Sequence, residues 1–128
     1  MKNWSAHFIF DQSFSWKSLE KVFPEIFGII KGKKELSQEE EQHYTVKLEL
    51  NMREISNDKK PLGFHSEENG LTLIFPLDSH EMTIANNSSS EKVYDAAEEV
   101  SKLLKTKKIK FKLEYDKMKL IEIMKTRK

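Results

Sequence analysis

Two stretches of the chain alternate apolar and polar residues, and this period of two restricts the fold more than any other feature. Residues 44–53 alternate Tyr, Val, Leu, Leu and Met with polar side chains, and residues 108–115 alternate Ile, Phe, Leu and Tyr with lysines and a glutamate. Successive side chains of a strand point to opposite faces of its sheet. Each stretch therefore predicts a strand with one buried face and one solvated face.

Apolar residues recur every three or four positions in two other stretches, which predicts two amphipathic helices. The first covers residues 16–30 and is followed by Gly32, a residue suited to the C-terminal cap. Pro24 lies inside this stretch and removes a backbone donor. We therefore expect either a kink near Phe23 or two short helices in sequence. The second helix covers residues 93–104, and Ser88 or Ser90 supplies its N-cap.

Shorter segments complete the expected order of elements. Residues 5–10 predict a first strand, and residues 62–65 and 71–77 predict a hairpin that turns at Asn69-Gly70. Residues 82–85 predict a further strand. Residues 31–43 have no apolar period and are expected to form an exposed connector. Residues 116–128 fit a last strand or a terminal helix, and we favour the strand.

This order predicts an α+β fold in one domain that spans residues 1–128. The central strands are joined by short connections, so they must be largely antiparallel. We expect a two-layer sandwich, in which a mostly antiparallel sheet of about five to six strands carries two helices packed on one face.

Composition excludes several classes of protein. The chain has 128 residues and no cysteine, so it has no disulfide scaffold, thiol nucleophile or cysteine-ligated metal. Its four glycines match neither phosphate-binding motif, GxxxxGK[ST] or GxGxxG. No window approaches the ~20 apolar residues of a membrane span. We expect a cytoplasmic protein with no cofactor and no membrane association.

Two histidine and carboxylate pairs, His65 with Glu67 and Asp78 with His80, stand two residues apart and are candidates for a hydrolase or metal site. Both pairs lie in segments expected to be turns or strand ends, where polar residues collect without function. We therefore assign no catalytic and no metal-binding residue, and we expect a non-enzyme. His7, between apolar neighbours, is expected to be packed and hydrogen-bonded.

The charge is divided unevenly along the chain. Residues 1–101 carry 11 basic and 18 acidic side chains, a balance of −7, whereas residues 102–128 carry 11 basic and 3 acidic ones, a balance of +8. A concentrated positive patch is a candidate binding surface for an acidic partner. The predicted patch consists of Lys102, Lys105, Lys107, Lys108, Lys110 and Lys112, the last three in one row on a strand.

The leading hypothesis is a small non-enzymatic protein-interaction module, such as an adaptor or an immunity-type inhibitor, that docks another protein through this lysine patch and Trp4. The alternative is a nucleic-acid-binding accessory protein that uses the same lysines. Against the alternative, Phe111 and Tyr115 are expected on the buried face, where they cannot stack on bases. A homodimer through an edge strand at residues 44–55 is a further possibility.

Overall fold

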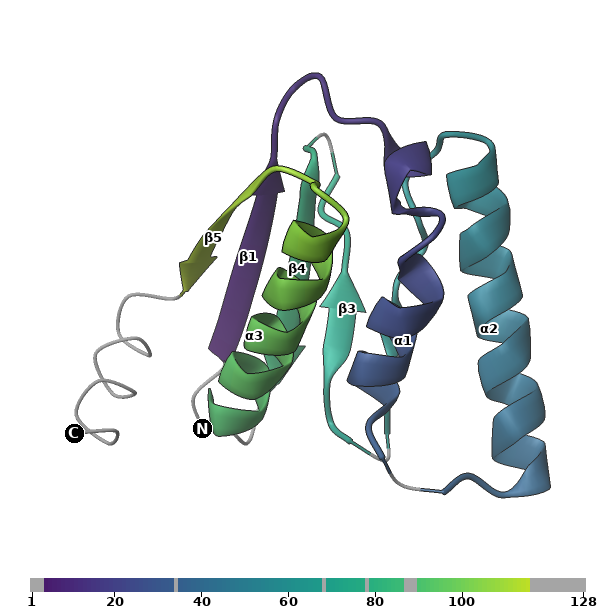
Figure 1. The fold of residues 1–128 in the computed structure, drawn as a ribbon. Helices are drawn as coiled ribbons and strands as arrows, with labels where there is room; N and C mark the ends of the chain where they lie inside the picture. Colours follow the sequence, from purple (N-terminus) through teal and green to yellow (C-terminus); the bar gives the residue numbers. More distant parts are fainter. Residues whose placement is uncertain (1–3, 34, 68, 78, 87–89, 116–128) are drawn as a thin grey trace.

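The computed structural model describes residues 4–33, 35–67, 69–77, 79–86 and 90–115. Five strands form one antiparallel sheet in the order β2-β3-β4-β1-β5 (Figure 1). The strands are β1 (Trp4–Phe10), β2 (Phe64–His65), β3 (Thr72–Ile74), β4 (Glu81–Asn86) and β5 (Phe111–Tyr115). The helices are the 3-10 helix η1 (Trp16–Leu19), α1 (Phe23–Lys31), α2 (Gln38–Ser56) and α3 (Ser90–Thr106). The predicted α+β class is confirmed.

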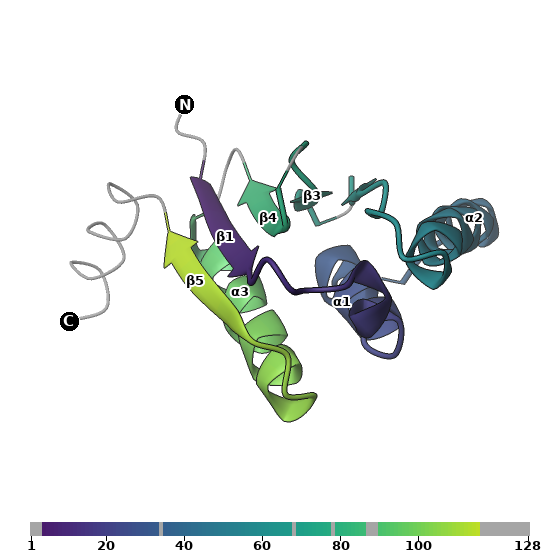
Figure 2. The same ribbon diagram turned by 90° about the horizontal axis from the view of Figure 1, so that it is seen from above.

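One face of the sheet is covered by helices. Figure 2 shows α1 and α3 on the same side of the strands, as predicted, with α2 further out beside α1. α3 lies over β1 and β4, two neighbouring interior strands, and α1 packs beside it. The third helix, α2, was not expected from the sequence, and it packs against η1 and α1 at the margin of the helix layer.

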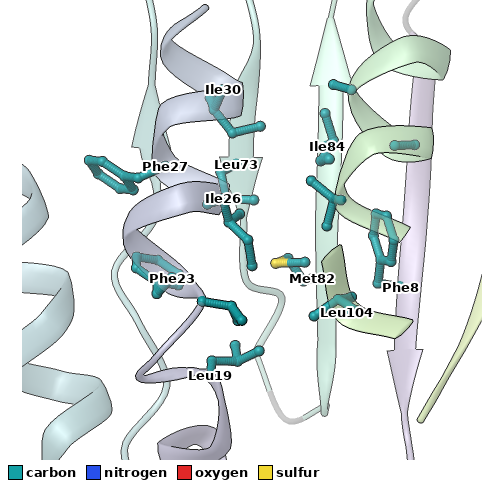
Figure 3. Close-up of a cluster of buried hydrophobic side chains, with 14 of the residues drawn as sticks. Phe8, Leu19, Phe23, Ile26, Phe27, Ile30, Leu73, Met82, Ile84 and Leu104 are labelled. Atoms are coloured by element: carbon teal, nitrogen blue, oxygen red, sulfur yellow. The ribbon is translucent and has the colours of Figure 1, made fainter. Parts of the chain in front are cut away.

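The core lies between the sheet and these helices (Figure 3). Alternate residues of the strands, among them Phe8, Met82 and Ile84, are fully buried. From the helix side they meet Ile26 of α1 and Leu104 of α3. At roughly 1.5–3 kcal/mol for each large buried side chain, this layer supplies much of the folding free energy.

The strand predicted at residues 44–53 is wrong, because these residues lie inside α2. The exposed connector predicted at residues 31–43 is also too long, since the helix begins at Gln38. Ser37 and Glu40 form a capping box: the Ser37 hydroxyl accepts from the Glu40 N–H at 3.2 Å, and the Glu40 carboxylate accepts from the Ser37 N–H at 2.7 Å. This start signal outweighs the alternation that follows it.

The buried face of α2 explains how two periods coexist in one segment. Tyr44, Leu48 and Ile55 are spaced by four and seven residues, so they share one side of a helix and pack against the core. Val46, which the strand interpretation would bury, is 53% exposed. The apolar residues of 44–53 therefore fit one side of a helix as well as one face of a strand.

Pro24 has the predicted effect, because the segment forms two short helices in sequence, η1 and α1. The proline lies in the first turn of α1, where its missing donor costs no intrahelical hydrogen bond. Gly32 follows α1 with a φ of 84°, the left-handed conformation that favours glycine. Both predictions for this stretch are confirmed.

The other predicted elements are confirmed, with β2, β3 and β5 shorter than predicted and β1, β4 and α3 longer. β2 and β3 pair as an antiparallel hairpin through the Asn69-Gly70 turn, and the predicted strand at residues 82–85 is β4. β5 begins at Phe111 rather than at residue 108, because Lys108 has a φ of 59° and belongs to the turn after α3. The predicted cap Ser88 and the segment 116–128 lie outside the described residues.

Candidate functional site

The side of the sheet that faces away from the helices is the first candidate surface, and we call it the open face. No helix in the described ranges covers it (Figure 2). The register of the strands brings together the alternate side chains that are not in the core. They are Ser5, His7 and Ile9 of β1, Glu81, Thr83 and Ala85 of β4, Thr72 and Ile74 of β3, and Lys112 and Glu114 of β5.

A polar network occupies the centre of the open face. The His7 Nε2 lies 2.8 Å from the Ser5 hydroxyl, and its Nδ1 lies 3.0 Å from both the Glu81 carboxylate and the Thr83 hydroxyl. Thr83 also donates to Glu81 at 3.2 Å. Because β1 and β4 are antiparallel neighbours, the two bonds of His7 Nδ1 cross from one strand to the other and reinforce their register. The prediction that His7 is hydrogen-bonded is confirmed.

Ser5, His7 and Glu81 stand in the order of a nucleophile, base and acid triad. Acyl transfer also needs backbone N–H groups aimed at the developing oxyanion. β1 lies between β4 and β5 and is paired with both, so its N–H groups over the shared registers are committed to the sheet ladders. The arrangement can therefore orient a hydroxyl and a carboxylate, but these strands supply it with no oxyanion donors.

The sequence pattern could not reveal this network. His7 and Glu81 are separated by 74 positions, and no local spacing connects them. The only signal was that His7 lies on a predicted strand and that Glu81 directly precedes another, without the pairing that brings β1 beside β4. The network is thus a product of strand order.

All six residues of the predicted lysine patch are exposed. The turn after α3 holds two of them together, because the Lys108 N–H donates to the Lys105 carbonyl at 3.0 Å. The predicted row of Lys108, Lys110 and Lys112 on one strand is wrong, since β5 starts at Phe111. Of the six, Lys112 is the one with a described carboxylate partner, Glu114 at 3.1 Å.

The two aromatic residues of β5 face the helix layer, as predicted. Phe111 and Tyr115 pair in register with Phe10 and Ala6, which are core residues of β1. Tyr115 stacks on Tyr94 with ring centroids 5.5 Å apart, and its hydroxyl donates to Glu98 at 3.2 Å. Burial, followed by the charge of Glu98, raises the pKa of Tyr115 above its ordinary value.

Trp4 is the first residue of β1 and pairs in register with Asn86 at one end of the sheet. The six lysines, by contrast, belong to α3, the following turn and β5. In the strand ladder β5 reaches β1 only from Ala6 onward, so Trp4 is not one of its register partners. The partner-binding role predicted for Trp4 stays a prediction.

The histidine and carboxylate candidates are not brought together. His65 and Glu67 line a cavity of about 320 Å³ between α1, α2 and β2, whereas His80 lines a different hollow beside Trp16 and Phe10. Asp78 lies outside the described residues. Within the described ranges, no three His, Asp or Glu side chains are placed to hold a metal ion.

Comparison with family models, with curated proteins and with solved structures found no match to this chain. None of the helices in the described part of the chain has the length and apolar character needed to cross a bilayer. The candidate surfaces are therefore interpreted from their own chemistry.

Proposed function

We propose that this chain is a non-enzymatic protein-interaction module that binds a second, folded protein through the open face. The single observation that carries the proposal is that helices cover only one face of the sheet in the described residues (Figure 2). An antiparallel sheet with a solvated second face offers a flat, rigid surface built on paired strands. Such a surface fits a flat surface of another protein better than it fits a small molecule, because small molecules bind in concave sites.

The chemistry of the open face supports this proposal. Small or apolar side chains, including Ala85 and Ile9, flank the polar network at its centre, and Ile74 is 42% exposed. Charged residues, including Lys112 and Glu114, stand on the outer strand β5. A surface that combines apolar residues with charged residues at its margin is compatible with a protein interface.

The polar groups of the open face are already paired before a partner arrives. His7 hydrogen-bonds to Ser5 within β1 and to Thr83 on β4, and His65 hydrogen-bonds to Thr72 on β3 at 2.7 Å. Covering such groups leaves fewer unsatisfied donors and acceptors than covering solvated ones, which lowers the desolvation cost of binding. The same network lacks oxyanion donors, which supports a binding role rather than catalysis. The expected cytoplasmic location belongs to the same proposal.

The proposal is tested by affinity capture from native lysate with two matched variants. Ala85→Arg places a long charged side chain on the open face between Ser5 and Thr72, its register neighbours. Val46→Arg makes the same kind of change on an exposed side of α2. We expect the wild type and Val46→Arg to retain the same protein in stoichiometric amount, with or without nuclease, and Ala85→Arg to lose it.

Two results would contradict the proposal. One is the absence of any stoichiometric protein partner, and the other is equal retention by Ala85→Arg. Circular dichroism and thermal melting of all three proteins establish that a loss of binding does not follow from a loss of folding.

A second candidate function is nucleic-acid binding through the lysine patch. The observation that favours it is the exposure of all six lysines, of which only Lys112 has a carboxylate partner among the described residues. We expect any such binding to weaken steeply with added salt, because phosphate contacts release counterions. Replacing Lys102, Lys105 and Lys107 by Glu should abolish it, and a flat salt dependence would remove this candidate.

A further inference from the structure

We propose that β5 pairs with β5 of a second copy of this chain, antiparallel and two-fold symmetric about Leu113, so that two sheets join into one. This inference goes beyond the proposed function and does not depend on it, because it uses the edge of the sheet rather than its open face. It also replaces the dimer expected through residues 44–55, which form a helix.

The two edges of the sheet differ in how they are protected. At the β2 edge, the buried Asn51 of α2 donates to the Gly63 carbonyl at 3.0 Å and accepts from the Gly63 N–H at 2.8 Å. The Asn51 side chain therefore hydrogen-bonds to the backbone of Gly63, the residue before β2. At the other edge, β5 pairs with β1 on one side and is the last strand of the sheet within the part of the chain that the structure describes. A terminal strand presents backbone donors and acceptors that can template a further strand.

The charges of β5 match a second copy of the same strand. Lys112 and Glu114 are both on the open face, 3.1 Å apart, and lie symmetrically about Leu113. Antiparallel pairing about Leu113 places Lys112 of each copy directly opposite Glu114 of the other copy. Opposite charges in directly opposed positions stabilise a strand pair, and like charges destabilise it.

The same charges select one register. A shift of two residues brings Lys112 opposite Lys112 or Glu114 opposite Glu114, depending on its direction. A shift of one residue opposes polar and apolar faces, because the side-chain period is two. The alternating charges therefore favour the arrangement centred on Leu113 over its neighbours.

The helix side of β5 offers apolar surface to a second strand. α3 packs mainly over β1 and β4, and it reaches β5 at Tyr115, which stacks on Tyr94 and donates to Glu98. Phe111 and Leu113, which face that side, are only partly buried although they pack against the core. A neighbouring β5 would cover their exposed edges, and Leu113 would lie beside Leu113 of the second copy.

Charge reversal in the full-length chain tests this pairing. In the Lys112→Glu dimer, two acidic side chains stand opposite each other at both paired positions, and in the Glu114→Lys dimer two basic side chains do. Because like charges destabilise a strand pair, each variant alone should raise the dimer dissociation constant by about tenfold or more. A mixture of the two variants restores both opposite-charge pairs between the chains. We expect the mixture to form a heterodimer of wild-type strength by sedimentation equilibrium.

The mixture separates pairing between chains from the ion pair within one chain. The Lys112–Glu114 pair is broken in both single variants and stays broken in each chain of the mixture, so recovery requires contact between copies. Lys105→Glu, the same charge change away from the edge, should leave the dissociation constant unchanged.

Three outcomes would overturn the proposal. They are a monomer at every accessible concentration, a dimer that Lys112→Glu does not weaken, and a mixture no stronger than its components. A strict monomer would leave the edge to another protein or to residues 116–128 of the same chain. Circular dichroism of each variant checks that the fold persists.

Discussion

Asn51 illustrates how one buried polar residue joins two elements. It is 1% exposed, and besides its bonds to Gly63 its amide donates to the Lys47 carbonyl at 2.9 Å. Gly63 itself has a φ of 102°, and a Cβ there would meet the Leu73 carbonyl oxygen at 2.7 Å. A glycine and a buried amide thus fix the start of β2 against α2.

Tyr115 gives a residue-scale prediction about pH. Unfolded tyrosines ionise near pH 10, whereas burial and Glu98 keep Tyr115 protonated above that pH in the folded chain. The unfolded state therefore releases a proton first, and the free energy of unfolding falls as pH rises above about 10. Tyr115→Phe should make this decline shallower, by about 0.5–1 kcal/mol at pH 11 once solvent screening is allowed for.

Urea unfolding at several pH values between about 9 and 11 measures this effect. Tyr115→Phe also removes packing and a hydrogen bond, and this loss lowers stability at pH 7 as well as at high pH. The comparison therefore uses the slope of the free energy of unfolding with pH rather than the absolute stability. Parallel curves for the two proteins would contradict the prediction.

At the scale of elements, the start of α2 decides what the following residues become. The Ser37 and Glu40 capping box satisfies backbone donors that a helix otherwise leaves free. Glutamates at positions 39, 40 and 41 add negative charge at the positive end of the helix. Local capping and charge therefore favour the helix, although residues 44–53 also alternate as a strand would.

Ser37→Ala should destabilise the protein by about 1 kcal/mol, because it removes the capping oxygen. Ser37→Asp keeps an oxygen that accepts from the Glu40 N–H, so its stability should stay close to that of the wild type. The midpoint of urea unfolding at an unchanged slope gives both values. Equal midpoints for the alanine and aspartate variants would show that the cap contributes nothing.

For the whole molecule, the core is one continuous cluster of buried residues. It includes residues from the sheet, from α1 and α3, and Ile55 near the end of α2. Trp16, which is 6% exposed, lies at one end of this cluster against Phe10 and Phe75. A single shared core favours cooperative loss of all elements together.

This predicts that the chain unfolds as one unit. In Trp4→Phe the remaining tryptophan, Trp16, reports the η1 end of the core by fluorescence, and far-ultraviolet circular dichroism reports the helices. The two denaturation curves should coincide. A separate, earlier transition in the circular dichroism signal would mean that part of the helix layer unfolds on its own.

Elements that have a local cause could be predicted from the sequence. Pro24 divided the first helical stretch, Gly32 ended it, Asn69-Gly70 turned the hairpin, and the three-and-four spacing of Val93 to Leu104 placed α3. In each case the responsible residues are neighbours in the chain, and their backbone preferences act whatever surrounds them. The α+β class follows from these elements together.

Tertiary structure decided what depends on residues far apart in the chain. The local cap starts α2, but contacts of Tyr44 with the distant Phe27 and Phe64 determine which face of the helix is buried. The network of Ser5, His7 and Glu81 exists only because β1 pairs with β4, and β5 is the edge strand of the described sheet only because of strand order. Local preferences are too weak to encode such partners, since pairing and burial energies arise only once distant segments meet.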